Sequence, residues 1–156
     1  MQTFLPYPSF ERSARVLDRT RLGKQRVEAL QIHRALIRPV YGWKHHPAVL
    51  MWSGYEEALL CYATAMCEEW RRRGHPDSCL AQMLEESRVG MPRSQRTLKA
   101  SGALPPWLGT RAFHRAHQSA LVRKDPDWYR PHFPDVPDDL PYVWPTRSAP
   151  HSHRPA

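Results

Sequence analysis

The chain has 156 residues, a hydrophobic fraction of 41% and a formal net charge of +8. This length and composition favour one globular domain over a disordered chain. No apolar run approaches the roughly 20 residues that a bilayer-spanning helix needs. The first residues also lack the apolar core and cleavage site of a signal peptide. We therefore expect a cytoplasmic monomer that does not associate with membranes.

The positive charge is unevenly distributed along the chain. Residues 11–44 hold nine Lys or Arg and three acidic residues, whereas residues 45–70 hold four acidic residues and no Lys or Arg. A basic surface attracts polyanions, because protein cations that contact phosphates release the counterions condensed there. Nucleic acid is therefore the partner class that the charge favours.

Helical periodicity dominates the apolar pattern, and no segment alternates as a strand does. The predicted helices cover residues 9–20, 22–38, 47–73, 77–88 and 110–124. Gly23 is expected to mark a bend between the first two helices. Residues 89–109 are predicted to form a loop, with Pro-Pro-Trp as a rigid corner. The fold class that follows is all-α, a compact single-domain helical bundle.

Both ends of the chain depart from the helical pattern. Residues 1–8 are predicted to be extended, because Pro6 and Pro8 disfavour a helix. The segment after residue 124 is rich in Pro, Asp and aromatic residues, and we expect it to wrap the helices as an ordered arm. The domain should therefore cover residues 1–145, and residues 146–156 are predicted to form a disordered tail.

The segment around Glu28 is the most informative for chemistry. On a helix, Glu28 lies at the edge of an apolar stripe, with Lys24 and Gln31 as neighbours one turn away and Arg21 two turns away. A carboxylate at the edge of a core, surrounded by cations and amides, is typical of a catalytic acid. The alternative is an ordinary Lys24–Glu28 helix ion pair.

Two further patterns have more than one interpretation. His114 and His117 lie on one helical face, and with His46 they leave a zinc or iron site open as an alternative, although the general expectation is no metal and no cofactor. Trp128-Tyr129 follows Arg123-Lys124, a mixture suited to base stacking and phosphate contact. A core role for His117 and an anchoring role for the arm remain alternatives, with Trp128 buried and Tyr129 at the surface.

Taken together, these segments resemble the pyrimidine-dimer DNA glycosylases, the phage endonuclease V type of ultraviolet-repair enzyme. The resemblance rests on the order of four features between Met1 and about Phe133. These are an apolar start (Thr3-Phe4-Leu5), a helix with Arg21-Leu22 and then Glu28, a long aromatic-rich helix from His46 to Gly74, and the Pro126-Asp127-Trp128-Tyr129 ending. The segments RLGKQRVEALQI and DDLPYVWP are similar to those of a bacterial branch of this superfamily.

The resemblance implies an all-helical domain that acts on double-stranded DNA. A free N-terminal amine would attack C1′ of the damaged nucleotide and displace the base, and β-elimination could then cut the strand. The family's catalytic glutamate corresponds to Glu28. The large Gln2 side chain should disfavour methionine removal, so the amine is expected at Met1, with Gln2 beside it. Val27 and Gln31 stand where the family has arginines.

The residues expected to contact DNA are Arg21, Lys24, Arg26, Gln31, His46, His117, Arg123, Lys124, Trp128 and Tyr129. Two other functions stay open at this point. One is a non-catalytic DNA-binding module on the same scaffold, which needs neither a free amine nor Glu28. The other is a metal-dependent hydrolase that uses His46, His114 and His117.

Overall fold

The computed structural model describes residues 1–145, and every regular element within that range is a helix. The helices are α1 (Phe10–Val16), α2 (Arg19–Ile37), α3 (Pro47–Leu50), α4 (Glu56–Arg72), α5 (Cys79–Glu86), α6 (Gln95–Ala100), α7 (Arg111–Lys124) and α8 (Pro126–Tyr129). The all-α prediction is confirmed. The predicted tail, 146–156, lies outside the described residues. In the described range, no helix is both long and apolar enough to cross a bilayer.

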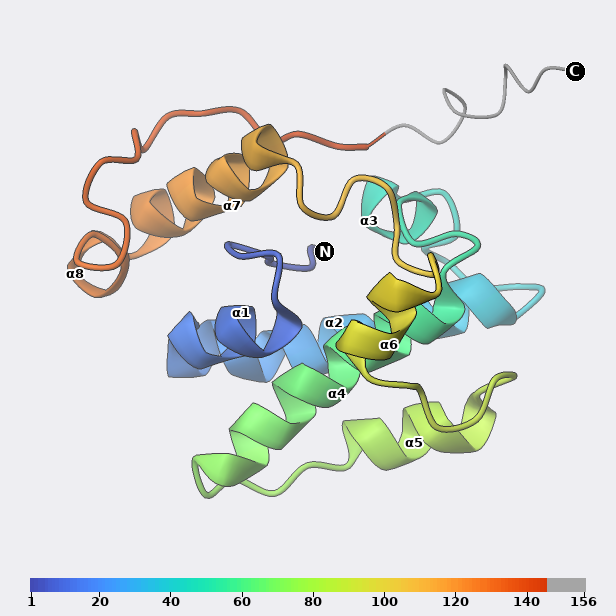
Figure 1. The fold of residues 1–156 in the computed structure, drawn as a ribbon. Coiled ribbons are helices and arrows are strands. Elements are labelled where there is room, and N and C mark those ends of the chain that lie inside the picture. Colours follow the sequence, from blue (N-terminus) through green and yellow to red (C-terminus); the bar gives the residue numbers. More distant parts are fainter. Residues whose placement is uncertain (146–156) are drawn as a thin grey trace, which may run out of the picture.

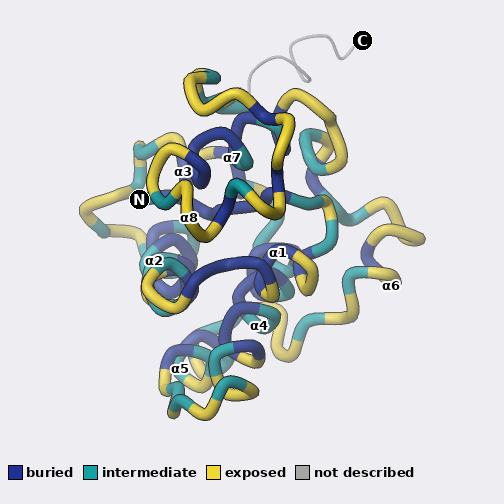
Figure 2. The backbone as a smooth tube through the Cα atoms, turned by 90° about the vertical axis from the view of Figure 1, so that its left-hand side faces the viewer, coloured by how far each residue is buried: buried dark blue, intermediate teal, exposed yellow. Residues whose placement is uncertain are grey.

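The N-terminal segment lies between two groups of helices (Figure 1). On one side α4 packs against both α1 and α2, and α5 packs on α2 and α4. On the other side α7 and α8 form a second layer, and the C-terminal arm runs along its outer surface (Figure 1). Buried residues line the inner faces of the helices, and exposed residues follow the loops (Figure 2). The first residues of the chain are therefore part of the core.

The predicted helix over 47–73 is wrong as one continuous element. It is divided into α3 and α4 by a turn in which Gly54 has φ +87°. A positive φ is a conformation that glycine adopts without steric cost. Glu56 and Glu57 then occupy the first turn of α4, where acidic side chains interact favourably with the helix dipole. The sequence therefore contained signals for the end of one helix and the beginning of the next, but the continuous apolar stripe concealed them.

Two short helices were not predicted. Helix α6 lies inside the predicted loop 89–109 and begins at Ser94, whose hydroxyl accepts the Thr97 N–H. Helix α8 begins at Asp125, whose carboxylate accepts the Trp128 N–H. The two helices have only six and four residues, so an apolar period cannot be recognised in them, and their capping residues are the available signal.

Gly23 does not bend the chain, and α2 runs through it without interruption. Instead, Gly23 leaves space for the ring of Trp70 on α4, since an added Cβ would lie 3.0 Å from that ring. The ring has little freedom to move. Its Nε1 donates to the Pro76 carbonyl at 3.0 Å, and the Arg26 guanidinium lies 4.4 Å from its centroid.

We therefore expect Gly23→Ala to destabilise the protein, although alanine is the better helix former. The close contact with Trp70 should cost about 1 to 3 kcal/mol, against a gain in helix propensity of about 0.5 to 1 kcal/mol. Chemical denaturation would measure the change, with Gly42→Ala as the control because no atom lies within 4 Å of that added Cβ. A Gly23→Ala protein as stable as wild type would contradict this packing account.

The anchoring of α8 reverses the predicted exposure of its two aromatic residues. Tyr129 is fully buried; its hydroxyl donates to the Asp18 carboxylate and accepts the Asp18 N–H at 2.9 Å. Trp128 is 45% exposed, and its indole donates to the Val16 carbonyl at 2.8 Å. The prediction of a buried Trp128 and an exposed Tyr129 is wrong, because the phenol has a buried carboxylate and N–H to satisfy and the indole does not.

Candidate functional site

Side chains from α2 and α7 fix the backbone of the first residues. The Gln2 N–H donates to Glu28 Oε1 at 2.8 Å, the Phe4 N–H to Gln25 Oε1 at 2.7 Å, and the Leu5 N–H to His117 Nδ1 at 2.9 Å. An extended segment inside a helical protein has no strand to pair with, so its buried amides need such acceptors. The position of the N-terminus is thereby determined by side chains on both layers.

Further contacts hold the same segment from α4 and the turn before it. The Tyr62 hydroxyl lies 3.0 Å from the Phe4 carbonyl and 2.5 Å from Gln25 Oε1. The indole of Trp52 donates to the Thr3 hydroxyl at 3.1 Å. All four side chains in these contacts are buried. Because so many groups converge on residues 3 and 4, the chain start cannot shift without breaking several hydrogen bonds.

The HxxH pair on α7 binds the backbone of Leu5. His117 Nδ1 accepts the Leu5 N–H, and His114 Nδ1 lies 2.8 Å from the Leu5 carbonyl, to which it must donate. His114 Nε2 in turn accepts the Gly109 N–H. Within residues 1–145, no three His, Cys, Asp or Glu side chains are grouped as metal ligands. The two histidines at this spacing thus hold the N-terminal segment in place through the backbone of Leu5.

Burial lowers the pKa of His117 to about 3, so this imidazole stays neutral in the fold. In the unfolded chain it takes up a proton near its ordinary pKa of about 6.5. The contribution of neutral His117 to the free energy of unfolding should therefore be fully present above that pH. It should decrease as the pH falls from about 6.5 toward 3. Over most of that window the unfolded state binds one more proton than the folded state does.

His117→Asn should weaken this pH dependence, because an amide oxygen can accept the Leu5 N–H without titrating. Between pH 7 and pH 4.5, wild type should lose about 2 to 3 kcal/mol more stability than the variant. Urea denaturation at both pH values measures the difference. Equal losses in the two proteins would show that His117 is not held neutral as the acceptor for the Leu5 N–H. His114, whose pKa burial also lowers, remains in both proteins and cancels from the comparison.

Glu28 and the first two residues share a pocket of about 310 Å³. Its wall combines the predicted catalytic residues with cations from α2 and α7 and with two aromatic rings from the C-terminal arm. These lining residues are Met1, Gln2, Glu28, Arg21, Lys24, Lys124, Tyr142 and Trp144. A carboxylate, an N-terminal residue, cations and aromatic rings are therefore brought together from three distant parts of the chain.

A second hollow of about 400 Å³ lies on the adjoining surface of α2. Lys24 and Glu28 line this hollow as well as the first pocket, and Arg19, Gln31 and Trp70 are among its other lining residues. Glu28 is thus accessible from two sides. The predicted helix neighbours Lys24 and Gln31 do lie beside Glu28, as the periodicity indicated.

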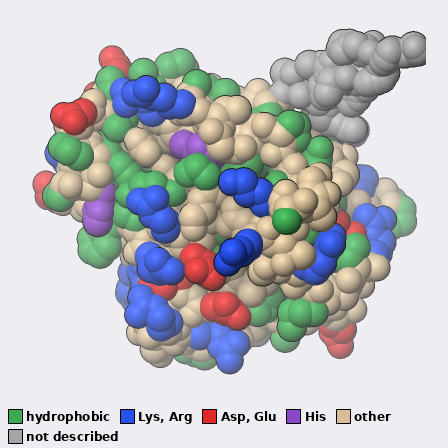
Figure 3. Space-filling view, viewed as in Figure 1, with side chains coloured by type: hydrophobic (Ala, Val, Ile, Leu, Met, Phe, Trp, Pro, Cys, Tyr) green, Lys and Arg blue, Asp and Glu red, His purple; other side chains and the backbone are tan. Residues whose placement is uncertain are grey.

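Four cations line the two hollows beside Glu28, and only Arg21 among them has an ion-pair partner in the described part of the chain, Asp18 at 3.1 Å. Most arginines of the basic segment form ion pairs, including Arg34 and Arg38 with Glu86. By contrast, the side chains of Arg19, Lys24 and Lys124 have no hydrogen-bond or ion-pair partner among the described residues. On the face drawn in Figure 3, Lys and Arg side chains are spread out with acidic side chains among them. The unpaired cations around the two hollows are therefore a better guide to where phosphate would bind than the overall net charge is.

His46 lies near the N-terminal amine. Burial and that amine lower its pKa, and Glu28 opposes them. Its Nδ1 accepts the Ala48 N–H at 3.0 Å and so caps α3. Its ring meets the Trp144 ring edge-to-face at a centroid distance of 6.1 Å. His46 thus connects α3 to the rim of the pocket.

Other predicted DNA contacts lie elsewhere. Arg26 pairs with Asp77 and packs over Trp70, and its side chain is only 13% exposed. His117 and Tyr129 are buried, so neither can reach a phosphate or a base in this structure. Arg123 is exposed but donates to the Asp138 carbonyl. Arg26 is close to Glu28 in the sequence, but helix periodicity could not show that Arg26 would form an ion pair with Asp77 instead.

Sequence reasoning missed three residues at the pocket. Gln25 is a buried amide whose Oε1 accepts the Phe4 N–H and whose Nε2 lies 3.4 Å from Glu28 Oε1. Tyr142 and Trp144 belong to the segment that was predicted to wrap the helices, and neither was predicted at the site. Their position next to two free lysines depends on how the arm returns, which no local pattern reports.

The sequence model of the family described as pyrimidine dimer DNA glycosylase matches residues 1–83. This match covers more than half of the 156 residues, and the chain belongs to that family. It includes the N-terminal segment, Glu28 and helices α1 to α4. No curated protein and no solved structure matches the chain. Membership makes DNA the substrate and base excision the class of activity.

Proposed function

We propose that the protein removes a damaged or modified base from double-stranded DNA, with the N-terminal amine as nucleophile and Glu28 as the catalytic carboxylate. The observation that carries the proposal is the 2.8 Å hydrogen bond from the Gln2 N–H to Glu28 Oε1, with Met1 lining the same pocket. A nucleophile and a carboxylate within hydrogen-bond reach are what such a reaction needs.

In the proposed reaction, the unprotonated amine forms a bond to C1′ as the bond between C1′ and the base breaks. The departing base takes up a proton, and Glu28 stabilises the positive charge that develops at the sugar. Opening of the sugar ring then gives an imine between the amine and C1′. Loss of a proton from C2′ expels the 3′ phosphate, which is the abasic-site lyase step.

The amine belongs to Met1 if the methionine is kept. If the methionine is removed, the atom that now donates to Glu28 becomes the free amine of Gln2. Met1 and Gln2 both line the pocket that Glu28 lines, and the Gln2 nitrogen lies 2.8 Å from Glu28 Oε1. Lys24, Lys124 and Arg21 at its rim would hold phosphates on either side of the nucleotide, and Gln31 would extend the contact along α2.

Borohydride trapping tests this proposal. The protein is incubated with abasic-site duplex and with ultraviolet-irradiated duplex, the imine is reduced, and the covalent product is mapped by mass spectrometry. We expect a band on both DNAs that maps to the first residue of the chain. A band that maps to Lys24 or Lys124 would show that a lysine side chain, and not the N-terminal amine, is the nucleophile. DNA binding without any band would favour the non-catalytic module.

A further inference from the structure

The loop between α2 and α3 presents two exposed apolar side chains on a backbone that is held in place. Val40 is 88% exposed and Trp43 is 48% exposed. Lys44 Nζ donates to the Ala35 carbonyl at 2.7 Å and to the Arg38 carbonyl at 2.5 Å, and so ties the loop to the end of α2. Because single exposed apolar residues are common on protein surfaces, the position of these two decides whether they matter.

Trp43 differs from most tryptophans of the chain in its indole N–H. In four others this group donates to a backbone carbonyl or to a hydroxyl, and these are Trp52, Trp70, Trp107 and Trp128. The indole N–H of Trp43 has no partner among the described residues. The indole of Trp43 therefore contributes no hydrogen bond to the fold and is free to contact a ligand.

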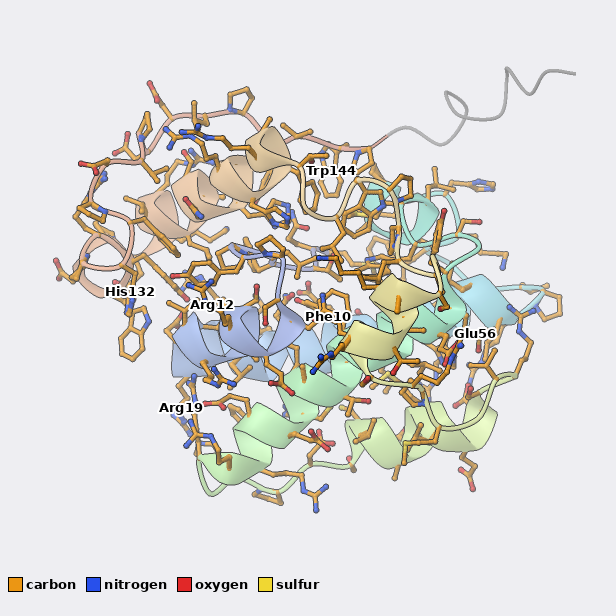
Figure 4. The ribbon with its side chains drawn as sticks, viewed as in Figure 1. Phe10, Arg12, Arg19, Glu56, His132 and Trp144 are labelled. Carbon is orange, nitrogen blue, oxygen red and sulfur yellow. The ribbon has the colours of Figure 1, made fainter. Side chains whose placement is uncertain are left out.

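One imidazole ring connects Trp43 to the rim of the pocket beside Glu28. The Trp43 ring meets the His46 ring edge-to-face at a centroid distance of 5.9 Å, and the same imidazole meets the Trp144 ring at 6.1 Å. Trp144 lines the pocket, and Figure 4 shows it beside α3. The Trp43 carbonyl also accepts the His46 N–H at 3.0 Å. Trp43 therefore lies next to the pocket but outside it.

We propose that Trp43 is a wedge, whose ring enters the base stack of the duplex at the step that the attacked nucleotide has left. Apolar side chains that insert between base steps unstack and kink a duplex, and an enzyme that acts on a base must keep the nucleotide out of the helix. This inference rests on the proposed function. It adds a positioning residue, because Trp43 acts on the duplex beside the pocket and touches no reacting atom.

The chemistry of the loop favours the base stack over a protein partner. A stable protein interface buries on the order of 800 Å² on each partner, far more than one half-exposed ring and one valine offer. A planar ring gains stacking contact between bases of any sequence. The unpaired cations Lys24 and Lys124 line the neighbouring pocket and suit the phosphates of the same duplex. The loop therefore adjoins the place where the duplex must lie if its nucleotide reaches Glu28.

The test compares an intact duplex with a duplex that is already open. Both contain a pyrimidine dimer at the same place, and the second lacks the nucleotides opposite the dimer. On the intact duplex, single-turnover base excision by Trp43→Ala should be roughly tenfold to a hundredfold slower than by wild type, because nothing holds the stack open. On the gapped duplex, the two rates should agree within about threefold, since no stacked pair has to be replaced. Trp43→Phe should recover most of the rate on the intact duplex.

Met91→Ala is the matched control. Met91 is an apolar side chain that is 70% exposed on the loop between α5 and α6, and it lines neither hollow beside Glu28. This substitution should leave both rates unchanged. Equal losses on the two duplexes for Trp43→Ala would overturn the wedge in favour of a general effect on the site through His46. An unchanged rate on the intact duplex would also overturn it.

Failure of the proposed function would look different. If wild type excises no base from either duplex, the excision proposal fails, and equilibrium binding then decides the role of Trp43. Trp43→Ala should in that case bind the intact damaged duplex roughly tenfold more weakly than wild type does, while both proteins bind the gapped duplex equally. Equal affinities for the intact duplex, or the same loss on both duplexes, would reject Trp43 as a wedge.

Discussion

Glu28→Gln is expected to slow base excision and abasic-strand cutting by roughly 100- to 10,000-fold, the usual contribution of a positioned acid or base. Glutamine cannot stabilise a developing positive charge at the sugar as a carboxylate does, and it cannot carry a proton. DNA affinity should stay close to that of wild type, because the free cations at the pocket are unchanged. Single-turnover kinetics and a binding titration measure the two effects separately.

The substitution is also conservative for the fold. The amide oxygen of glutamine can still accept the Gln2 N–H that now donates to Glu28 Oε1. The N-terminal segment should therefore keep its position, which thermal unfolding can check. Glu11→Gln is the matched control, since Glu11 forms only an exposed helix pair with Arg15. A Glu28→Gln protein that retains a tenth or more of wild-type activity would remove the carboxylate from the mechanism.

Much of the fold followed from local signals in the sequence. Ser9, the first residue of the predicted helix 9–20, caps α1, and the apolar residues Leu22, Ala29 and Ile32 on one side of the predicted helix 22–38 are buried. The errors arose where a turn was shorter than the window that reveals a period, as between α3 and α4. Around Gly54, the apolar stripe continued across a break in the backbone.

The pairing of Glu28 with the chain start could be expected only through the family resemblance. Periodicity placed Glu28 on the edge of α2. Its contact with Gln2 also requires that the N-terminal segment be held against α7, where Leu5 binds His117, a residue 112 positions further along the chain. Helix order does not report such distances. The opposite error concerns Arg26, which forms an ion pair with Asp77 in the loop before α5, and the sequence alone could not place that loop beside α2.

The aromatic residues illustrate the same limit at the other end of the chain. Trp128 and Tyr129 were the expected stacking pair, yet the buried Asp18 draws Tyr129 inward. Tyr142 and Trp144 reach the pocket because the arm crosses α7, where Ser119 holds Leu140. Residue type was therefore informative, whereas position depended on tertiary hydrogen bonds.

Extending the chain at its N-terminus by a few residues should abolish borohydride trapping and base excision. The extension converts the amine of Met1 into an amide, which has no lone pair available for attack on C1′. It would also fill the pocket, since Met1 lines it beside Glu28. The hydrogen bonds of Phe4 and Leu5 do not involve the first residue, so the fold should remain intact.

A protease-cleavable extension supplies the control within one preparation. Before cleavage, trapping on abasic-site duplex should be at background; after cleavage that leaves Met1 as the first residue, it should return to the wild-type level. Steric blockage can be separated from loss of the amine by acetylating the native N-terminus, which adds only two carbon atoms and one oxygen. If the acetylated protein still forms a reducible covalent complex, the nucleophile must be a side chain, and Lys24 and Lys124 are the amines that line the pocket.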